Sequence, residues 1–295
     1  MNTNFNLQLE ELKTRFEESL ESYLEQTHFE PEILDQSVKY SLRLGGKRLR
    51  PVLMYASAQI LGGKVQDVAN FSLALEMIHT YSLIHDDLPA MDNDDYRRGQ
   101  PSNHKKFGEG QAILAGDALL NEAFSICIAE CKKGRTYLRA AELLCENAGG
   151  KGMVGGQAAD LYYQGKPSAG KTEADFIVLN KTAKMIVSAI VVPAYIYDAD
   201  EQIISLLTQF GVNLGFLFQI TDDILDVDGK FEQLGKSIGK DEAENKLSFV
   251  RLYGLEKSRA LADAYRDNCI DILKQLPYEC DFLEQLVRRV RSRRS

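Results

Sequence analysis

The chain has 295 residues, of which 44% are hydrophobic, and this is enough to bury a sizeable core. Its formal net charge of −8 argues against bulk binding to nucleic acid, but a small anionic substrate stays open because local charge decides that. No apolar run approaches the roughly 20 residues that cross a membrane, and the acidic, amphipathic N-terminus does not resemble a signal peptide. We therefore expect a single domain over residues 1–295 in a cytoplasmic protein with no membrane insertion, whose scattered cysteines are reduced.

Apolar residues recur at helical spacing from the N-terminus onwards. The first such helical face consists of Leu9, Leu12, Phe16, Leu20 and Tyr23. The same spacing predicts further helices over Pro51–Leu61, Val68–Ile84, Ala112–Cys131, Tyr137–Ala148, Asp175–Ala194, Ile203–Asp226 and Lys257–Leu276. Strand-like alternation is nearly absent, and the run Met185–Tyr197 is apolar enough to be a fully buried helix. The sequence therefore predicts an all-α fold, a large helical bundle.

Two acidic clusters each follow a long apolar stretch. The first runs from Asp86 through Asp87 to Asp92, and the second contains Asp222, Asp223 and Asp226. On a helix of about 100° per residue, Asp222 and Asp226 share a face, whereas Asp86 and Asp92 would point about 120° apart. Because Pro89 disrupts the helical backbone between them, a bulge or kink there is expected to bring Asp92 back toward Asp86.

Carboxylates at the C-terminal end of a helix oppose its dipole, so these clusters need a positive partner. Oxygen ligands without His or Cys suit a hard cation, and Mg²⁺ fits best when a phosphate shares its coordination. Basic residues that could bind such a phosphate are Lys47, Arg48, Arg50, Arg97, Arg98, Lys181, Lys236 and Lys240. Arginine forks match the oxygens of a diphosphate. The sequence thus indicates a site in which aspartates hold Mg²⁺ and basic side chains hold a diphosphate.

Seven motifs, in order, carry a resemblance to a known family. They are GGKRLRP, HTYSLIHDDLPAMDNDDYRRG, NHKKFGEGQAILAGDALL, GMVGGQAADL, NKTAKMI, FQITDDILD and GKSIGKD. On these motifs the chain resembles the trans-isoprenyl diphosphate synthases, and among them the bacterial farnesyl diphosphate synthases. The resemblance implies an isoprenoid synthase bundle around a central cavity, a homodimer, and condensation of isopentenyl diphosphate with dimethylallyl or geranyl diphosphate.

The resemblance also implies roles for individual residues. Three Mg²⁺ ions are expected with substrate bound, and the implied metal ligands are Asp86, Asp92, Asp222, Asp223 and Asp226. The allylic diphosphate is implied to contact Arg97, Lys181, Thr182, Gln219 and Lys236. Isopentenyl diphosphate is implied to contact Lys47, Arg50, His79 and Arg98. The residues implied to act most directly in catalysis are Asp86, Asp92, Arg97, Lys181 and Asp222.

Product length should depend on the floor of the cavity. Tyr81 precedes Asp86 by five residues, about 7.5 Å deeper along the helix, and its neighbour Ser82 is small. In the family a bulky aromatic residue at this place blocks chain growth, so Tyr81 favours a product of fifteen carbons. The implied reaction is ionisation of the allylic diphosphate, attack by the double bond of isopentenyl diphosphate, and loss of a proton.

Other interpretations stay open on the sequence. A geranyl or geranylgeranyl diphosphate synthase would differ only in product length. A class I terpene cyclase usually carries a different second metal motif and lacks a GGKRLRP segment, and an HD-type phosphohydrolase needs more histidines than the 4 present. A catalytically silent helical subunit would not need both aspartate motifs. The basic C-terminal run RRVRSRR is expected to be a solvated tail.

Overall fold

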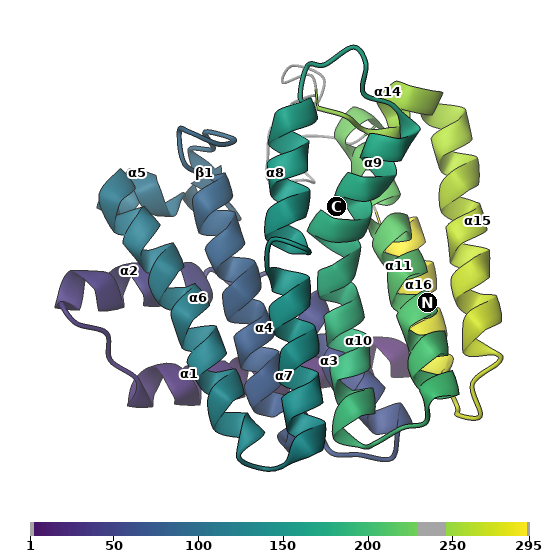
Figure 1. The fold of residues 1–295 in the computed structure, drawn as a ribbon, viewed down its shortest axis with the longest axis horizontal. Coiled ribbons are helices and arrows are strands. Elements are labelled where there is room, and N and C mark those ends of the chain that lie inside the picture. The colour runs from purple at the N-terminus through teal and green to yellow at the C-terminus, as the bar shows by residue number, and fades with distance from the viewer. Residues whose placement is uncertain (1–2, 229–245, 294–295) are drawn as a thin grey trace.

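Helices form most of this structure, a computed structural model that describes residues 3–228 and 246–293. The earlier helices are α1 (Thr3–Gln26), α2 (Glu32–Arg43), α3 (Leu49–Ile60), α4 (Val65–Asp86), α5 (Asn103–Phe107), α6 (Glu109–Cys131) and α7 (Arg135–Ala148). The later ones are α8 (Met153–Tyr163), α9 (Lys171–Ile177), the π-helical turn η1 (Val178–Ala183), α10 (Lys184–Ile196), α11 (Glu201–Asp228), α14 (Phe249–Tyr253), α15 (Leu255–Leu273) and α16 (Asp281–Ser292). Within these two ranges the only strands are the antiparallel pair β1 (Tyr96–Arg97) and β2 (Gln100–Pro101). The predicted all-α class is confirmed (Figure 1).

The helix α10 forms the centre of the core. Its residues from Met185 to Ala194 are all buried, and it packs against α3, α4, α7 and α11. A helix that is apolar on every side needs other helices on every side, because any exposed face would lose hydrophobic stabilisation. The structure thus confirms that the apolar run Met185–Tyr197 is a central core helix.

The helices α4 and α11 both pack against α10 and carry their C-terminal ends to the same end of the bundle, at the top of Figure 1. Asp86 is the last residue of α4, and Asp222–Asp226 lie near the end of α11. The fold therefore brings the two acidic clusters, which are far apart in the sequence, to one end of the molecule.

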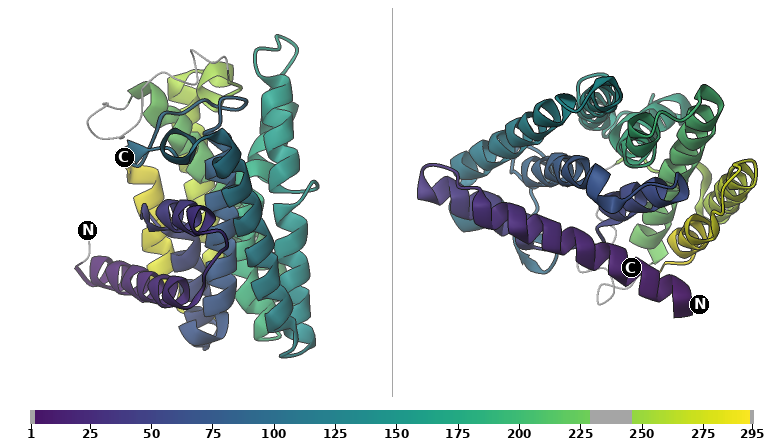
Figure 2. Two further views of the ribbon diagram at one scale, coloured as in Figure 1. Left: turned by 90° about the vertical axis from the view of Figure 1, so that its left-hand side faces the viewer. Right: turned by 90° about the horizontal axis from the view of Figure 1, so that it is seen from below.

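The helix α1 crosses the bundle instead of running along it, as both views of Figure 2 show. Its residues that are buried in the core are Phe5, Leu12, Phe16, Leu20 and Leu24. Leu9 and Tyr23 pack at the margin, so the predicted apolar face is confirmed. The helix α1 contacts α3 and α4, and its Glu17 accepts a hydrogen bond from Arg48 of the GGKRLRP segment that leads into α3.

Three stretches of the described residues are long and apolar enough to cross a membrane by length and composition: Glu109–Cys131, Lys171–Ile196 and Glu201–Asp228. The prediction that no apolar stretch approaches this length is therefore wrong, because isolated charged residues do not prevent a high average hydropathy. In Lys171–Ile196, 78% of the most apolar window is buried inside the bundle, so packing accounts for its composition. In α6 only 39% of that window is buried, and Ile113 and Ile128 are exposed.

Two glycines, one on α8 and one on α11, allow these helices to pack closely against the turn η1. A Cβ on Gly156 of α8 would lie 2.2 Å from the backbone nitrogen of Lys181, and one on Gly215 of α11 would lie 2.3 Å from the Cβ of Ala183. Neither helix could approach η1 so closely with a side chain at these positions. Since η1 carries Lys181 and Thr182, the two glycines decide where these polar side chains lie. Such π-turns occur frequently at functional sites.

Gly156→Ala should lower the free energy of unfolding by about 1–3 kcal/mol, the usual cost of overpacking, because the backbone of Lys181 cannot rotate away. Thermal unfolding measures this change. Gly110→Ala in α6 is the matched control, since a Cβ there meets nothing within 4 Å and alanine favours a helix more than glycine does. Equal unfolding temperatures for the two variants would contradict the close packing of α8 on η1.

Candidate functional site

Two adjoining cavities lie at the end of the bundle where α4 and α11 end. The first, which we call the apolar chamber, has a volume of about 350 Å³ and is lined largely by α4 and α8, including Tyr81 and Met153. The second, the charged mouth, has a volume of about 240 Å³ and is lined by both aspartate clusters. The residues that line both are Leu83, Asp86, Lys181 and Thr182. A polar group in the mouth could therefore be continuous with an apolar tail in the chamber.

The turn after α4 brings Asp92 back beside Asp86. The helix ends at Asp86, and the backbone N–H of Asp92 donates to the carbonyl oxygen of Asp86 at 2.8 Å. The backbone N–H of Asn93 donates to the carbonyl oxygen of Leu88 at 3.1 Å. The reversal predicted at Pro89 is thus confirmed, and both carboxylates line the charged mouth.

Asp87 does not line the charged mouth that Asp86 lines, and it binds Arg97 instead. Its side chain is buried and accepts hydrogen bonds from Nε of Arg97 at 3.0 and 3.2 Å. Arg97 stands on β1, lines the charged mouth and also lies 3.5 Å from Asp94. Asp87 therefore fixes the orientation of Arg97, which faces the mouth where the sequence predicts a diphosphate.

The second cluster is part of a hydrogen-bonded chain. Its residues on α11 that line the charged mouth are Gln219, Asp222, Asp223 and Asp226. Asp223 accepts hydrogen bonds from Nε2 of Gln219 at 3.0 Å and from the backbone N–H of Phe249 at 2.7 Å. Oε1 of Gln219 in turn accepts a hydrogen bond from Oγ1 of Thr182 at 3.0 Å. This chain ties α11 to η1 and to the start of α14.

Lysines from two other segments enter the charged mouth. Nζ of Lys181 lies 2.6 Å from Asp160 of α8, and Nζ of Lys246 lies 3.1 Å from Asp92. Burial alone would lower the pKa of Lys181, but Asp160 and then Asp86 raise that pKa above its usual value, so the ammonium stays charged. Asp160 and Lys246 are absent from the predicted set, although Asp160 lies within the GMVGGQAADL motif.

The C-terminal end of the described chain also reaches the mouth. Nη2 of Arg293 donates to Asp222 at 3.2 Å and to the carbonyl oxygen of Phe218 at 2.8 Å. The Arg293 side chain is only 9% exposed, so the expectation of a solvated tail is wrong at this residue. No local pattern could predict the contact, because it joins residues 71 positions apart.

The carboxylates of the mouth suit Mg²⁺ only if other ligands share it. Within residues 3–228 and 246–293, no group of three His, Cys, Asp or Glu side chains forms a ready-made metal site. Mg²⁺ is usually held by one or two carboxylates, with waters and phosphate oxygens completing the octahedron. The oxygen donors on both sides of the mouth therefore fit Mg²⁺ that arrives with a diphosphate.

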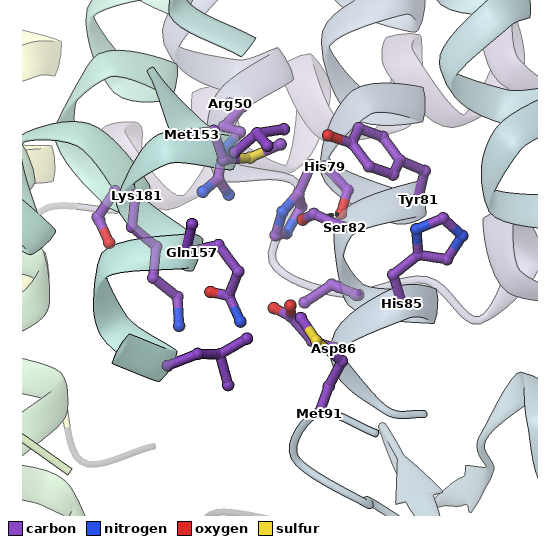
Figure 3. Close-up of a pocket in the computed structure, with 15 residues that line it drawn as sticks. Arg50, His79, Tyr81, Ser82, His85, Asp86, Met91, Met153, Gln157 and Lys181 are labelled. Carbon is purple, nitrogen blue, oxygen red and sulfur yellow. Dashed lines mark hydrogen bonds between the residues drawn. The ribbon is translucent and has the colours of Figure 1, made fainter. Parts of the chain in front are cut away.

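Arg50, His79 and Arg98 form a cationic corner next to the chamber. Arg50 and His79 line the chamber and lie close together in Figure 3. Burial, and then the charges of Arg50 and Arg98, hold the pKa of His79 well below its usual value, so its ring is neutral. Burial also lowers the pKa of Arg50, whose Nε has no hydrogen-bond partner in the described chain. Donors with this placement suit an anionic ligand.

Lys47, a predicted contact of isopentenyl diphosphate, and Lys236, a predicted contact of the allylic diphosphate, have different outcomes. Lys47 is exposed on the loop before α3 and lines neither cavity. Lys236 lies outside the described residues, as does Lys240. Of the basic residues that were predicted to bind diphosphate, the structure therefore brings only some to the two cavities, among them Arg50, Arg97 and Lys181.

Tyr81 and His85 form one wall of the chamber. Their ring centres are 5.7 Å apart in a T-shaped arrangement. Ser82 also lines the chamber, and its Oγ donates to the carbonyl oxygen of His79 at 2.9 Å. Nε2 of His85 lies 3.0 Å from the carbonyl oxygen of Ile113 in α6. His85 is thus directed toward α6, and nothing supports the HD-type phosphohydrolase.

Gln157 is a polar group that the predicted set lacks. Both polar atoms of its side chain are buried and have no hydrogen-bond partner in the described chain. In Figure 3, Gln157 and Lys181 point from one side into the space that Asp86 faces from the other. The amide of Gln157 therefore lies between the mouth and the chamber, where it could form hydrogen bonds with a ligand.

Comparisons with known proteins agree with this geometry. The sequence model of the polyprenyl synthetase family matches residues 31–280. The farnesyl diphosphate synthase of Micrococcus luteus is 44% identical over 267 residues, which cover 90% of this chain and 91% of that protein. A chloroplastic geranylgeranyl pyrophosphate synthase of Catharanthus roseus is 44% identical over 237 residues, covering 79% of this chain and 66% of that protein. A crystal structure of geranyltransferase from Helicobacter pylori, complexed with magnesium and isoprenyl diphosphate, has a TM-score of 0.82 at 31% identity and covers 98% of this chain and 97% of its own.

Asp86→Asn should stabilise the chain at pH 8 when no cation is added. Burial raises the pKa of Asp86 to about 6, while Lys181 lowers it and Asp92 raises it. A carboxyl with a raised pKa binds its proton more tightly in the folded state, so folding is less favourable above that pKa. The neutral amide removes this penalty, and the unfolding temperature at pH 8 should rise.

The pH dependence provides the control for this prediction. At pH 5 the Asp86 carboxyl is largely protonated, so the difference between variant and wild type should shrink. Adding Mg²⁺ with inorganic diphosphate should reverse the order, because a charged carboxylate binds the cation more tightly than a neutral amide does. A variant that is less stable than wild type at pH 8 without Mg²⁺ would contradict the raised pKa.

Proposed function

This chain belongs to the polyprenyl synthetase family, and from that premise we propose that it joins isopentenyl diphosphate to dimethylallyl or geranyl diphosphate to make farnesyl diphosphate. The observation that carries the proposal is the charged mouth beside the apolar chamber. The mouth suits the diphosphate of a substrate and the chamber suits its hydrocarbon tail. The similarity to the Micrococcus luteus farnesyl diphosphate synthase supports this product.

The proposed cofactor is Mg²⁺, with three ions in the substrate complex. The side chains that would hold them are Asp86, Asp92, Asp222, Asp223 and Asp226, all of which line the mouth. When bound, Mg²⁺ would neutralise the charge that grows on the departing diphosphate. The Helicobacter pylori structure, complexed with magnesium and isoprenyl diphosphate, supports magnesium as the cation.

The chain's own groups would hold the allylic diphosphate while its C–O bond breaks. Lys181 stays charged because Asp160 is beside it, and Arg97 is oriented by Asp87. Thr182 and Gln219 are already hydrogen-bonded to each other, so little rearrangement is needed when charge develops. Lys236 is included with these groups only because it lies in the GKSIGKD motif.

The cationic corner would hold isopentenyl diphosphate. Arg50 and Arg98 supply charge, and neutral His79 can donate one hydrogen bond without adding to their repulsion. Lys47 would complete this subsite from the loop. The double bond then attacks the allylic cation inside the chamber, whose lining surface is mostly apolar and would help to exclude water. The released diphosphate is the proposed proton acceptor.

We also propose that the chain acts as a cytoplasmic homodimer that binds no nucleic acid and does not insert into a membrane. The outer face of α6 exposes Ile113, Leu114 and Ile128, and apolar residues gathered on one helix suit a protein interface. Light scattering of the purified chain tests the dimer.

Geranylgeranyl diphosphate is the second candidate product. Val154 and Leu161 of α8 line the chamber and are partly exposed, so this wall is less closed than the wall at Tyr81. The 44% identity to the Catharanthus roseus enzyme fits the same alternative.

Product analysis distinguishes these candidates. The purified chain would be incubated with Mg²⁺, labelled isopentenyl diphosphate and either dimethylallyl or geranyl diphosphate, and the dephosphorylated alcohols separated by chain length. Farnesol from both starters is expected. Geranylgeraniol as the main product would favour the second candidate, and no condensation at all would contradict the proposed function.

Tyr81→Ala should lengthen the product. Removing the ring opens space in the chamber, where an apolar tail gains about 0.8 kcal/mol for each buried methylene group. Another condensation then becomes favourable before release, and longer alcohols should appear.

A matched control is Tyr265→Ala, because Tyr265 stacks on Phe216 at 5.1 Å and lines neither cavity. This control loosens packing elsewhere without changing the chamber, so its product should be unchanged. A fifteen-carbon product from both variants would mean that another side chain stops the growing tail.

A further inference from the structure

Arg48 is a buried arginine that the proposed reaction does not use. Its side chain is 0% exposed. Nε and Nη2 donate to the two carboxylate oxygens of Glu17 at 2.9 and 3.2 Å, and Nη1 donates to Glu76 at 2.8 Å. Nη2 also donates to the carbonyl oxygen of Leu42 at 2.7 Å, and the guanidinium lies 5.4 Å from the centre of the Phe16 ring. The prediction that Arg48 is a candidate phosphate ligand is therefore wrong, because the side chain is fully buried and four of its five N–H donors are used inside the protein.

These contacts join three helices to the loop between α2 and α3. Glu17 lies on α1, Leu42 in the last turn of α2 and Glu76 on α4. The carbonyl group of Leu42 has no partner within its own helix, because the last four carbonyls of a helix have none. A planar guanidinium can satisfy two carboxylates and a carbonyl together, whereas the ammonium of a lysine is a single point charge.

The loop that Arg48 anchors has an uncommon backbone. Gly45, Gly46 and Arg48 have φ values of 74°, 126° and 47°. The left-handed conformation costs a residue other than glycine roughly 1–2 kcal/mol. Such residues persist only where their surroundings hold them in place. The contacts of the Arg48 side chain hold this strained backbone.

The shape of the loop decides where two arginines of the cationic corner lie. Arg50 follows in the first turn of α3 and lines the chamber. A Cβ on Gly46 would lie 2.5 Å from the guanidinium carbon of Arg98, so the loop backbone lies directly against that side chain. Burial lowers the pKa of Arg50 and of Arg98, and the charge of Glu76 acts in the opposite direction.

We propose that Arg48, Glu17 and Glu76 form a positioning cluster for the isopentenyl diphosphate subsite and do not themselves touch substrate. The cluster fixes the loop, and the loop places Arg50 and Arg98. The inference rests on the proposed function, because that function assigns the two arginines to this substrate. It also gives α1 a role, since a helix that crosses the bundle then controls affinity for one of the two substrates.

The test compares Glu17→Gln and Arg48→Lys with two matched controls. Arg43 of α2 pairs with Glu21, which lies one turn after Glu17 on α1, but both side chains of this pair are 47% exposed. Glu21→Gln therefore removes this ion pair between α1 and α2, and Arg43→Lys replaces its planar guanidinium by a point charge, while neither variant changes a contact of Arg48. For every variant one measures kcat, the KM for isopentenyl diphosphate, the KM for geranyl diphosphate and the unfolding temperature.

The KM for isopentenyl diphosphate should rise roughly tenfold in Glu17→Gln and in Arg48→Lys, because small misplacements of binding groups have large effects. The KM for geranyl diphosphate and kcat should change by less than about twofold, and both controls should match wild type. Because Glu17 is partly exposed, Glu17→Gln should fold. It can therefore test the proposal even if Arg48→Lys fails to fold.

Two results would overturn the inference. An equal rise of both KM values would show that the cluster supports the whole site, and a lower unfolding temperature with unchanged KM values would show that it supports only the fold. A wild-type chain that condenses neither starter with isopentenyl diphosphate is a separate result, which contradicts the proposed function before any variant is compared.

Discussion

Negative charge is crowded at one end of the bundle, and the placement of several distant side chains offsets it. The carboxylates of Asp86, Asp92 and Asp222 line a cavity of about 240 Å³, where like charges repel one another. Basic side chains from distant segments offset this repulsion, with Lys246 beside Asp92 and Arg293 beside Asp222. Burial also raises the pKa of Asp86 to about 6. The negative charge that these basic groups offset would also attract divalent cations.

A second set of acidic side chains holds the groups that face the mouth. Asp87 holds Arg97, Asp160 holds Lys181, and Asp223 holds Gln219. Fixed groups stabilise developing charge better than mobile ones, because they need no reorganisation when the charge forms. Close packing of Gly156 and Gly215 against η1 serves the same end, since it fixes the backbone that carries Lys181 and Thr182. Arg48 and its two glutamates extend this principle to the neighbouring subsite.

Local patterns predict much of this arrangement. Helical spacing predicts α1, α4 and α10, and the proline within the first acidic cluster predicts the reversal that brings Asp92 to Asp86. The resemblance to the isoprenyl diphosphate synthases is confirmed by the family match over residues 31–280. Arg293 could not be predicted, because its contact with Asp222 exists only after α16 has packed on α11. The structural role of Arg48 could not be predicted for the same reason. Its partner Glu17 lies 31 positions away, and the neighbouring Lys47 and Arg50 do not indicate that contact.

In our proposal the charged mouth binds Mg²⁺ and a diphosphate together. Titration calorimetry of Mg²⁺ into the purified chain, with and without inorganic diphosphate, tests it most directly. Mg²⁺ alone should bind weakly, because no group of three ligating side chains forms a ready-made site among the described residues. With diphosphate present the affinity should rise by at least roughly tenfold, and binding of diphosphate should strengthen by the same factor when Mg²⁺ is present. Equal affinity for Mg²⁺ with and without diphosphate would contradict the account.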